Sequence, residues 1–170
     1  AHTIHTILTR SPLHAWTQSP RLNPSYERTE RDSFDLGTAV HDLWLRGQTD
    51  AVAVIEATDW RTKYAQEQKA EARENGMIPL LAKDWQRVRE MTDALRDQLA
   101  ARDDDPPLFA EDGKPEQALI WTEDGVQCRA LVDWLHADFA AITDLKTTAA
   151  SANPMSWTRI TMWNIGADIQ

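Results

Sequence analysis

Apolar residues recur at helical spacing in two long stretches of the chain. One runs from Phe34 to about Arg46, and the other from Trp85 to about Ala101. Intervals of i, i+3 and i+4 place each set on one side of an α-helix, so both stretches are predicted to be helices that pack on a core. Ser33 and Asp84 are the expected N-caps. The apolar sides comprise Phe34, Gly37, Val40, His41, Trp44 and Leu45 in the first stretch, and Trp85, Val88, Met91, Leu95 and Leu99 in the second.

Shorter elements are predicted around these two helices. Ser11-Pro12 is the pattern of an N-cap followed by proline at the first helical position, so a short helix is expected after it. The polar, proline-containing residues 18–32 predict a surface loop. Glycine at position 37, on a packed helix side, predicts close approach of a neighbouring segment. Further expected elements are a strand at residues 51–57, a helix at residues 60–75 that ends at Gly76, and a short strand or extended connector at residues 77–82.

The pattern changes to β after Leu108. Residues 116–122 and 126–135 predict two strands joined by a turn at residues 123–125, and residues 139–146 predict a third strand. Turn signals at this spacing favour an antiparallel meander. A final helix is expected from Trp157 onward. The three aspartates at residues 103–105 precede Pro-Pro, a context that favours a solvated turn over a metal site.

Composition places the chain among globular proteins with one domain. Its 170 residues are long enough to bury a core, and 42% are hydrophobic while 26% are charged. No apolar run approaches 18 residues, which argues against a membrane span, and the N-terminus lacks the pattern of a signal peptide. The single cysteine, Cys128, cannot form an internal disulfide and fits a reducing cytoplasm.

The net charge of -9 argues against indiscriminate binding to nucleic acid, although a local basic groove is compatible with it. The helix expected at residues 60–75 contains four basic residues. They indicate either a solvated helix face or a surface that contacts the DNA backbone. The four residues are Arg61, Lys63, Lys69 and Arg73.

The charged residues near the ends of the last strands form the main candidate for chemistry. Asp133 lies near the end of one strand, and Asp144 and Lys146 close the next, where alternation places both on one face. Two carboxylates could hold Mg²⁺, and the lysine could orient a water or offset charge on a phosphate. Glu116 could add a third carboxylate and His41 a nitrogen ligand. Exposed strand-end charges are the competing interpretation.

Five segments in this order resemble the phage and prophage exonucleases of the RecE type, within the PD-(D/E)xK nuclease superfamily. They are SPLHAW (11–16), FDLGTAVHDLWL (34–45), PEQALIW (115–121), CRALVDW (128–134) and ITDLKTT (142–148). The resemblance covers nearly the whole chain. It implies an α/β (α+β) fold in which helices flank a mixed β-sheet with a central antiparallel meander. It also implies a Mg²⁺- or Mn²⁺-dependent deoxyribonuclease that digests double-stranded DNA from its ends for a single-strand annealing protein, often as a homo-oligomeric ring.

The resemblance also implies roles for individual residues. Asp133, Asp144 and Glu116 match metal-binding carboxylates of the catalytic site, and His41 matches a histidine metal ligand. Lys146 matches the catalytic lysine. In the family a glutamine and a tyrosine follow the lysine motif and bind DNA, and Gln170 could be that glutamine. The chain ends there, so a nuclease domain spanning 1–170 but truncated at its C-terminal end is expected.

Three alternatives to an exonuclease remain at this level. A structure-specific endonuclease could use the same residues and the same metal chemistry. A catalytically weak or inactive DNA-binding relative of the same fold is a further possibility, because the chain ends early. A structural protein without a nucleic-acid role is supported only by the acidic charge.

Overall fold

The computed structural model describes residues 2–26, 32–104, 107–139, 141–148, 151 and 153–159. Two compact units are present, one formed by Ala1–Glu30 with Thr148–Gln170 and the other by Arg31–Thr147. The first unit contains helices α1 (His2–Thr9), α2 (Pro12–Gln18) and α6 (Pro154–Arg159). Ser11 caps α2 as predicted, with its hydroxyl accepting the N–H of His14, and proline occupies the first turn.

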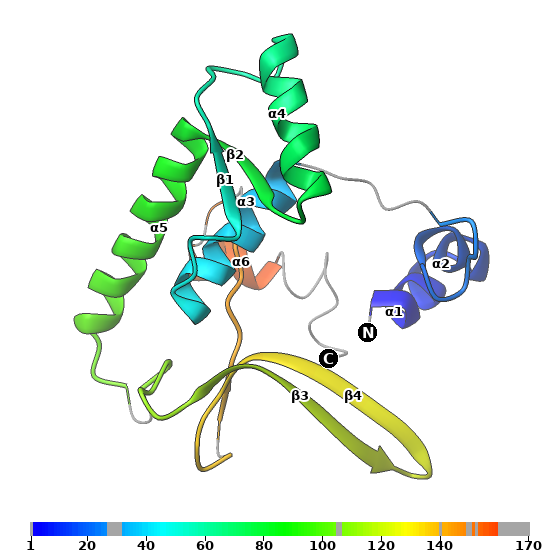
Figure 1. Ribbon diagram of the computed structural model, residues 1–170. Helices are drawn as coiled ribbons and strands as arrows, with labels where there is room; N and C mark the ends of the chain where they lie inside the picture. Colours follow the sequence, from blue (N-terminus) through cyan, green and yellow to red (C-terminus); the bar gives the residue numbers. More distant parts are fainter. Residues whose placement is uncertain are drawn as a thin grey trace. The chain divides into compact units, whose positions relative to one another are not determined.

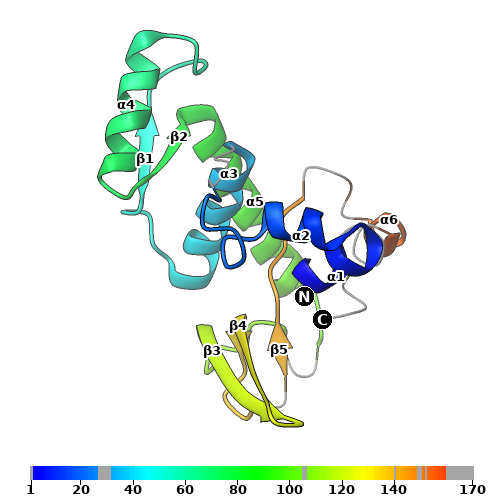
Figure 2. The ribbon, with the colours of Figure 1, turned by 90° about the vertical axis from the view of Figure 1, so that its right-hand side faces the viewer.

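The second unit begins with helices and a parallel strand pair. Its elements are α3 (Asp32–His41), the π-helical turn η1 (Asp42–Arg46), β1 (Val52–Ile55), α4 (Lys63–Glu74), β2 (Ile78–Leu81) and α5 (Ala82–Ala100). The strands pair in parallel from Val52↔Ile78 to Ile55↔Leu81, and α4 forms the crossover between them (Figure 1). Gly76, at φ 70°, ends the crossover helix as predicted. Figure 2 shows α4 on one side of the strand pair and α3 with α5 on the other.

The main core of the second unit lies between these helices and strands. Ala39 and Val40 of α3 pack with residues of both strands and with Val88 of α5, which is fully buried. Trp85 and Met91 pack against the same cluster, so the predicted apolar stripe of α5 faces the core. The predicted cap at Asp84 is wrong. Because β2 runs directly into α5, Leu81 takes the N-cap position and the aspartate lies inside the first helical turn.

An antiparallel sheet completes the second unit. It consists of β3 (Lys114–Glu123), β4 (Val126–Leu135) and β5 (Ile142–Thr143), in the order β3-β4-β5. Asp124 and Gly125 join the first two strands with φ values of 49° and 79°. Both values are positive, as in the type I′ turn that favours a tight hairpin. The predicted hairpin and its turn are therefore confirmed.

The third strand is much shorter than predicted, because it covers only Ile142–Thr143 of the expected residues 139–146. Phe139 has φ 59° and lies in the turn that follows β4, with its N–H bonded to the His136 carbonyl. Beyond Thr143 the N–H of Leu145 donates to the side chain of Asp133 at 2.7 Å. Since that donor is used by a side chain, the ladder ends and residues 144–146 are not part of a strand.

Helices and strands combine in a mixed α/β fold, which confirms the expected fold class. In the described parts of the chain the strands form two sheets, one parallel and one antiparallel, where the family resemblance implied a single mixed sheet. The antiparallel meander itself is present. No described helix is both long and apolar enough to cross a membrane.

Candidate active site

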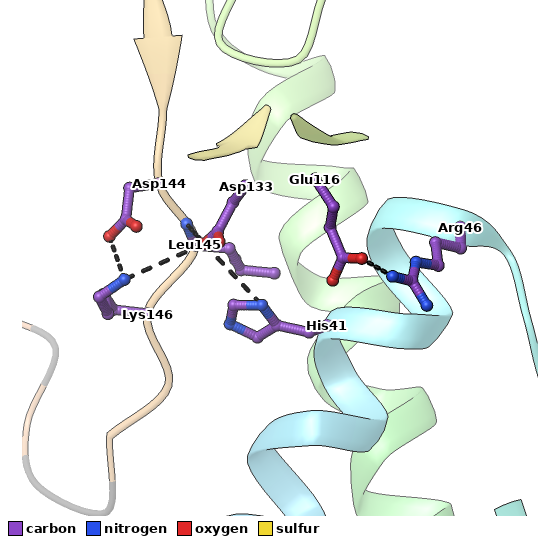
Figure 3. Close-up of polar contacts among 7 residues, drawn as sticks. All are labelled: His41, Arg46, Glu116, Asp133, Asp144, Leu145 and Lys146. Atoms are coloured by element: carbon purple, nitrogen blue, oxygen red, sulfur yellow. Dashed lines mark hydrogen bonds and ion pairs between the residues drawn. The ribbon is translucent and has the colours of Figure 1, made fainter. Parts of the chain in front are cut away.

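Asp133 is the centre of the predicted site. Its Oδ2 atom accepts the backbone N–H of Leu145 at 2.7 Å. The same oxygen lies 3.8 Å from Nδ1 of His41 and 4.0 Å from Nζ of Lys146. The Asp133 side chain is only 16% exposed, so these contacts are partly shielded from solvent. The end of α3, strand β4 and the segment after β5 therefore meet at one carboxylate, as Figure 3 shows.

The segment Asp144–Lys146 is fixed by its middle residue. Leu145 packs against the main core cluster while its N–H is held by Asp133. The residues on either side of it are partly exposed, and Nζ of Lys146 forms a close ion pair with the carboxylate of Asp144. The strand pattern predicted that these two side chains would lie together. They do so, although the segment has left the strand.

His41 reaches the site from the last turn of α3, where it is half-buried. One turn earlier, Gly37 lies close to the end of the candidate site segment. A Cβ atom at position 37 would lie 3.0 Å from Oγ1 of Thr147, which is tighter than most real contacts. The close approach predicted from the glycine is thus confirmed, and it brings α3 next to the segment that contains Asp144 and Lys146.

Glu116 occupies an unusual position in β3. Pro115 pairs with Trp134 and Gln117 with Val132, so Glu116 falls opposite Asp133 in the ladder, yet the two do not form a regular pair. Glu116 has φ 48°, a left-handed conformation that costs energy for a residue with a Cβ atom. Its carboxylate forms a close ion pair with the guanidinium of Arg46, which belongs to η1 (Figure 3).

Arg46 is the site residue that the sequence argument missed. Its guanidinium also lies 3.6 Å from the carboxylate of Asp42, four residues earlier. The i, i+4 spacing of Asp42 and Arg46 was visible in the sequence, but the contact with Glu116 depends on the π-helical turn and on the distorted strand. Neither feature has a sequence signal that would have predicted it.

An aromatic cluster supports the end of β4 next to Asp133. The ring of Phe109 packs edge-on against both Trp44 and Trp134, with centroids 5.5 and 5.8 Å apart. Gly113 allows the indole to approach, because a Cβ atom there would lie 2.1 Å from Nε1 of Trp134. These contacts join η1 to the strand that contains Asp133. The cluster is therefore assigned a packing role.

The donor atoms fit a hard divalent cation only in part. Among the described residues, no three His, Cys, Asp or Glu side chains are placed to hold one metal ion. His41 and Asp133 form a suitable pair, since two ligands at about 2.1 Å from one ion lie no more than about 4.2 Å apart and theirs are separated by 3.8 Å. Asp144 contacts Lys146, and Glu116 contacts Arg46. The predicted four-ligand set is therefore not assembled: His41 and Asp133 face each other, whereas Asp144 and Glu116 pair with cationic side chains.

The structure also bears on two other charged segments that the sequence singled out, the basic residues near α4 and the aspartates at residues 103–105. Several cations of the α4 region have partners, because Arg73 pairs with Asp35 at 2.8 Å, Lys63 with Glu67 at 3.5 Å, and Lys69 lies over the Trp60 ring. The contacts of Lys63 and Lys69 agree with a solvated helix face. The Arg73–Asp35 pair is partly buried and joins α4 to α3, which is a packing role. Asp104 pairs with Arg102, in agreement with a solvated turn. Gln170 lies outside the described residues.

Comparison with known proteins gives one family. The family described as "PDDEXK-like domain of unknown function (DUF3799)" matches residues 8–164, which is most of the chain and includes every described residue of the candidate site. No curated protein and no solved structure matches the chain.

Proposed function

We propose that this chain, which belongs to the PDDEXK-like family of unknown function (DUF3799), is a metal-dependent nuclease that hydrolyses phosphodiester bonds of double-stranded DNA from its ends. A PDDEXK-like domain indicates a nuclease-type function, that is, a hydrolase that acts on nucleic acid, and divalent metals are the general cofactors of such domains. The proposal adds three points: that the substrate is double-stranded DNA, that hydrolysis starts at DNA ends, and which residues perform the reaction.

One observation supports the proposal most strongly. A single carboxylate oxygen of Asp133 lies within 4.0 Å of both an imidazole nitrogen and a lysine ammonium, which come from a helix and from a segment after the last strand. A carboxylate, an imidazole and a lysine brought together at partly shielded positions are the groups that metal-assisted phosphodiester hydrolysis requires. Surface charges that served only solubility would have no reason to converge in this way.

Asp133, Asp144, His41 and Glu116 are the proposed ligands of Mg²⁺ or Mn²⁺. When bound, the ion would supply Lewis-acid activation of the phosphate and of a water nucleophile. Asp133 has a second task, because its hydrogen bond to the Leu145 N–H fixes the segment that contains Lys146. The Lys146 side chain is 44% exposed, so its ammonium can reach a water or a phosphate oxygen. It would orient the attacking water and offset the charge that develops on the phosphate.

The acidic character of the chain bears on how DNA would bind. Carboxylates repel the phosphate backbone, and the chain has a net charge of -9. A divalent cation would neutralise part of this charge at the cluster where the backbone must approach. Both DNA binding at the site and DNA cleavage should therefore depend on the metal.

Further parts of the proposal rest on the resemblance of five sequence segments to RecE-type exonucleases. They are a role in phage-type recombination, cooperation with a single-strand annealing protein, assembly into a homo-oligomeric ring, and a cytoplasmic location in a bacterial or phage-infected host. A contribution of Gln170 to DNA binding belongs to the same group.

A digestion assay tests the proposal. Linear and covalently closed duplexes of equal sequence are incubated with the protein and Mg²⁺ or Mn²⁺, and an EDTA sample serves as the control. We expect metal-dependent loss of the linear duplex while the closed circle survives, because a circle has no ends. Nicking of the circle would replace the exonuclease with an endonuclease. Retention of both substrates, with metal-dependent DNA binding, would indicate an inactive DNA-binding relative.

A further inference from the structure

Lys146 is held in place by contacts on both sides of it in the chain. Before it, the N–H of Leu145 donates to Asp133, and the Leu145 side chain packs against the core cluster that α3 helps to form. After it, Thr147 lies close to α3, because its Oγ1 would be 3.0 Å from a Cβ atom at position 37. Helix α3 therefore adjoins the chain on either side of Lys146.

The side chains of this stretch alternate between α3 and solvent. Asp144 and Lys146 are 52% and 44% exposed, whereas Leu145 and Thr147 are half-buried. Alternation of this kind is the geometry of an extended backbone. Leu145 and Thr147 are therefore the two inward side chains, and Lys146 is exposed between them.

The glycine at position 37 has a cost that its environment must explain. It lies inside α3, where alanine would favour the helix more than glycine does. Its φ value is not in the left-handed region, so the backbone conformation does not require glycine. The remaining reason is space, because a Cβ atom would force Thr147 to move by a few tenths of an ångström. The missing side chain of Gly37 is thus matched to Thr147.

We propose that Gly37 is a positioning residue for the DNA-hydrolysing site: it lets Thr147 lie against α3, and this contact sets where Lys146 stands relative to Asp133. The inference rests on the proposed nuclease function and adds Gly37 and Thr147, which act through Lys146. Nζ of Lys146 lies 4.0 Å from Oδ2 of Asp133. A displacement of Thr147 passes directly to Lys146, because the two residues share a peptide bond.

Cleavage kinetics are the first test. Single-turnover cleavage of a linear duplex with Mg²⁺ is measured at increasing protein concentration for wild type and Gly37→Ala. A misplacement of 1 Å can lower a rate about a hundredfold. Since the expected displacement is a few tenths of an ångström, Gly37→Ala should cleave about three- to tenfold more slowly at saturation. The affinity for DNA should stay unchanged, because Lys146 acts on the reacting phosphate.

Second-site variants identify the contact responsible. Thr147→Ala removes Oγ1, so adding Gly37→Ala to this variant should not lower its cleavage rate further. Thr147→Val keeps a methyl group in place of the hydroxyl and is the matched control. In that background Gly37→Ala should still slow cleavage about three- to tenfold. Coupling to alanine but not to valine would show that the contact acts through its volume.

Thermal stability separates a positioning role from a structural one. Alanine favours α3, so Gly37→Ala/Thr147→Ala should melt at a higher temperature than Thr147→Ala alone. A substitution that merely damaged the fold would lower the melting temperature together with the rate. Thr38→Ala is the control, because this neighbouring residue of α3 is exposed. It increases helix propensity without adding a group beside Thr147, so its cleavage rate should equal that of wild type.

NMR gives a measurement that needs no activity. The amide shifts of Lys146 and Thr147 should change in Gly37→Ala, whereas Gly37→Ala/Thr147→Ala should match Thr147→Ala at Lys146. Unchanged shifts in Gly37→Ala would overturn the contact. If circular dichroism shows that Gly37→Ala does not fold, the double variant decides. A folded double variant supports the contact, and an unfolded one overturns it.

The outcomes also separate this inference from the proposed function. Wild-type protein that degrades DNA, together with an unchanged rate in Gly37→Ala or no relief by Thr147→Ala, overturns the positioning role and leaves the nuclease intact. Wild-type protein that degrades no DNA overturns the nuclease, and with it the role of Gly37 in hydrolysis. In that case the NMR shifts alone report whether Gly37 places Thr147.

Discussion

Replacing Asp133 by alanine and by asparagine separates two tasks of one side chain. The carboxylate accepts the Leu145 N–H at 2.7 Å and also faces His41 and Lys146. Asparagine keeps an acceptor oxygen of the same shape but loses the charge, whereas alanine loses both. Since each variant removes the charge contacts, the difference between the two variants reports the hydrogen bond to Leu145.

The size of the difference follows from the burial of the bond. A hydrogen bond to a charged acceptor contributes about 1.5–3 kcal/mol, and one to a neutral acceptor about 0.5–1.5 kcal/mol. Asp133 is 16% exposed, so water can replace the lost acceptor only in part. We expect Asp133→Ala to lower the free energy of unfolding by about 1.5–3 kcal/mol. Asp133→Asn should keep roughly half of that contribution.

Urea denaturation followed by tryptophan fluorescence measures this difference. With an m value of about 2 kcal/mol per M, the midpoints of the two variants should differ by about 0.5 M. Amide hydrogen exchange gives a local check, because protection of the Leu145 N–H should be lost in the alanine variant and retained in the asparagine variant. Equal midpoints and equal protection would refute the view that Asp133 holds the Asp144–Lys146 segment.

Four further expectations follow. Gly113→Ala should destabilise the protein by about 1–3 kcal/mol, as overpacking does, because the new Cβ would overlap the Trp134 ring; an unchanged melting temperature would contradict the close packing. Lys146→Ala should abolish cleavage while Mn²⁺ binding, measured by calorimetry, is retained, and wild-type-like cleavage would exclude Lys146 from the mechanism. Mn²⁺ should raise the melting temperature of the wild type, since it binds the folded site and not the unfolded chain; no shift would count against a preformed metal site. The hydrogen bond from Arg102 lowers the pKa of Asp104 below its ordinary value. The small contribution of this pair to stability is therefore present above the unfolded-state pKa and disappears as pH falls through the folded-state pKa. Arg102→Gln should return the pKa of Asp104 toward its ordinary value in an NMR titration, and an unchanged pKa would contradict the pair.

The elements that depend on local periodicity could be predicted from the sequence. The stripe of α5 and the Asp124-Gly125 turn followed directly from helical spacing and from turn chemistry, because neighbouring residues determine them. The cap at Asp84 could not be predicted. The helix starts directly after Leu81, the buried last residue of β2, so no polar cap residue marks its beginning.

The candidate site was predictable in its main members but not in its contacts. His41, Asp133 and Lys146 were identified from residue type and from the family resemblance, and the structure brings them together. The sequence could not show that Leu145 would leave the strand to bond with Asp133. Nor could it show that Glu116 would pair with Arg46. The first contact joins two consecutive segments 12 residues apart and the second joins two distant segments, and neither follows from local residue spacing.

The most direct test of the central claim is cleavage of a linear duplex by wild type and by Asp133→Asn at equal protein concentration, with Mg²⁺ and with EDTA. The asparagine variant is suited to this comparison because its fold should be the less disturbed of the two Asp133 variants. The account predicts metal-dependent degradation by wild type and a loss of at least about a hundredfold for the variant, the scale of a lost catalytic group. Degradation at the wild-type rate by Asp133→Asn would contradict it.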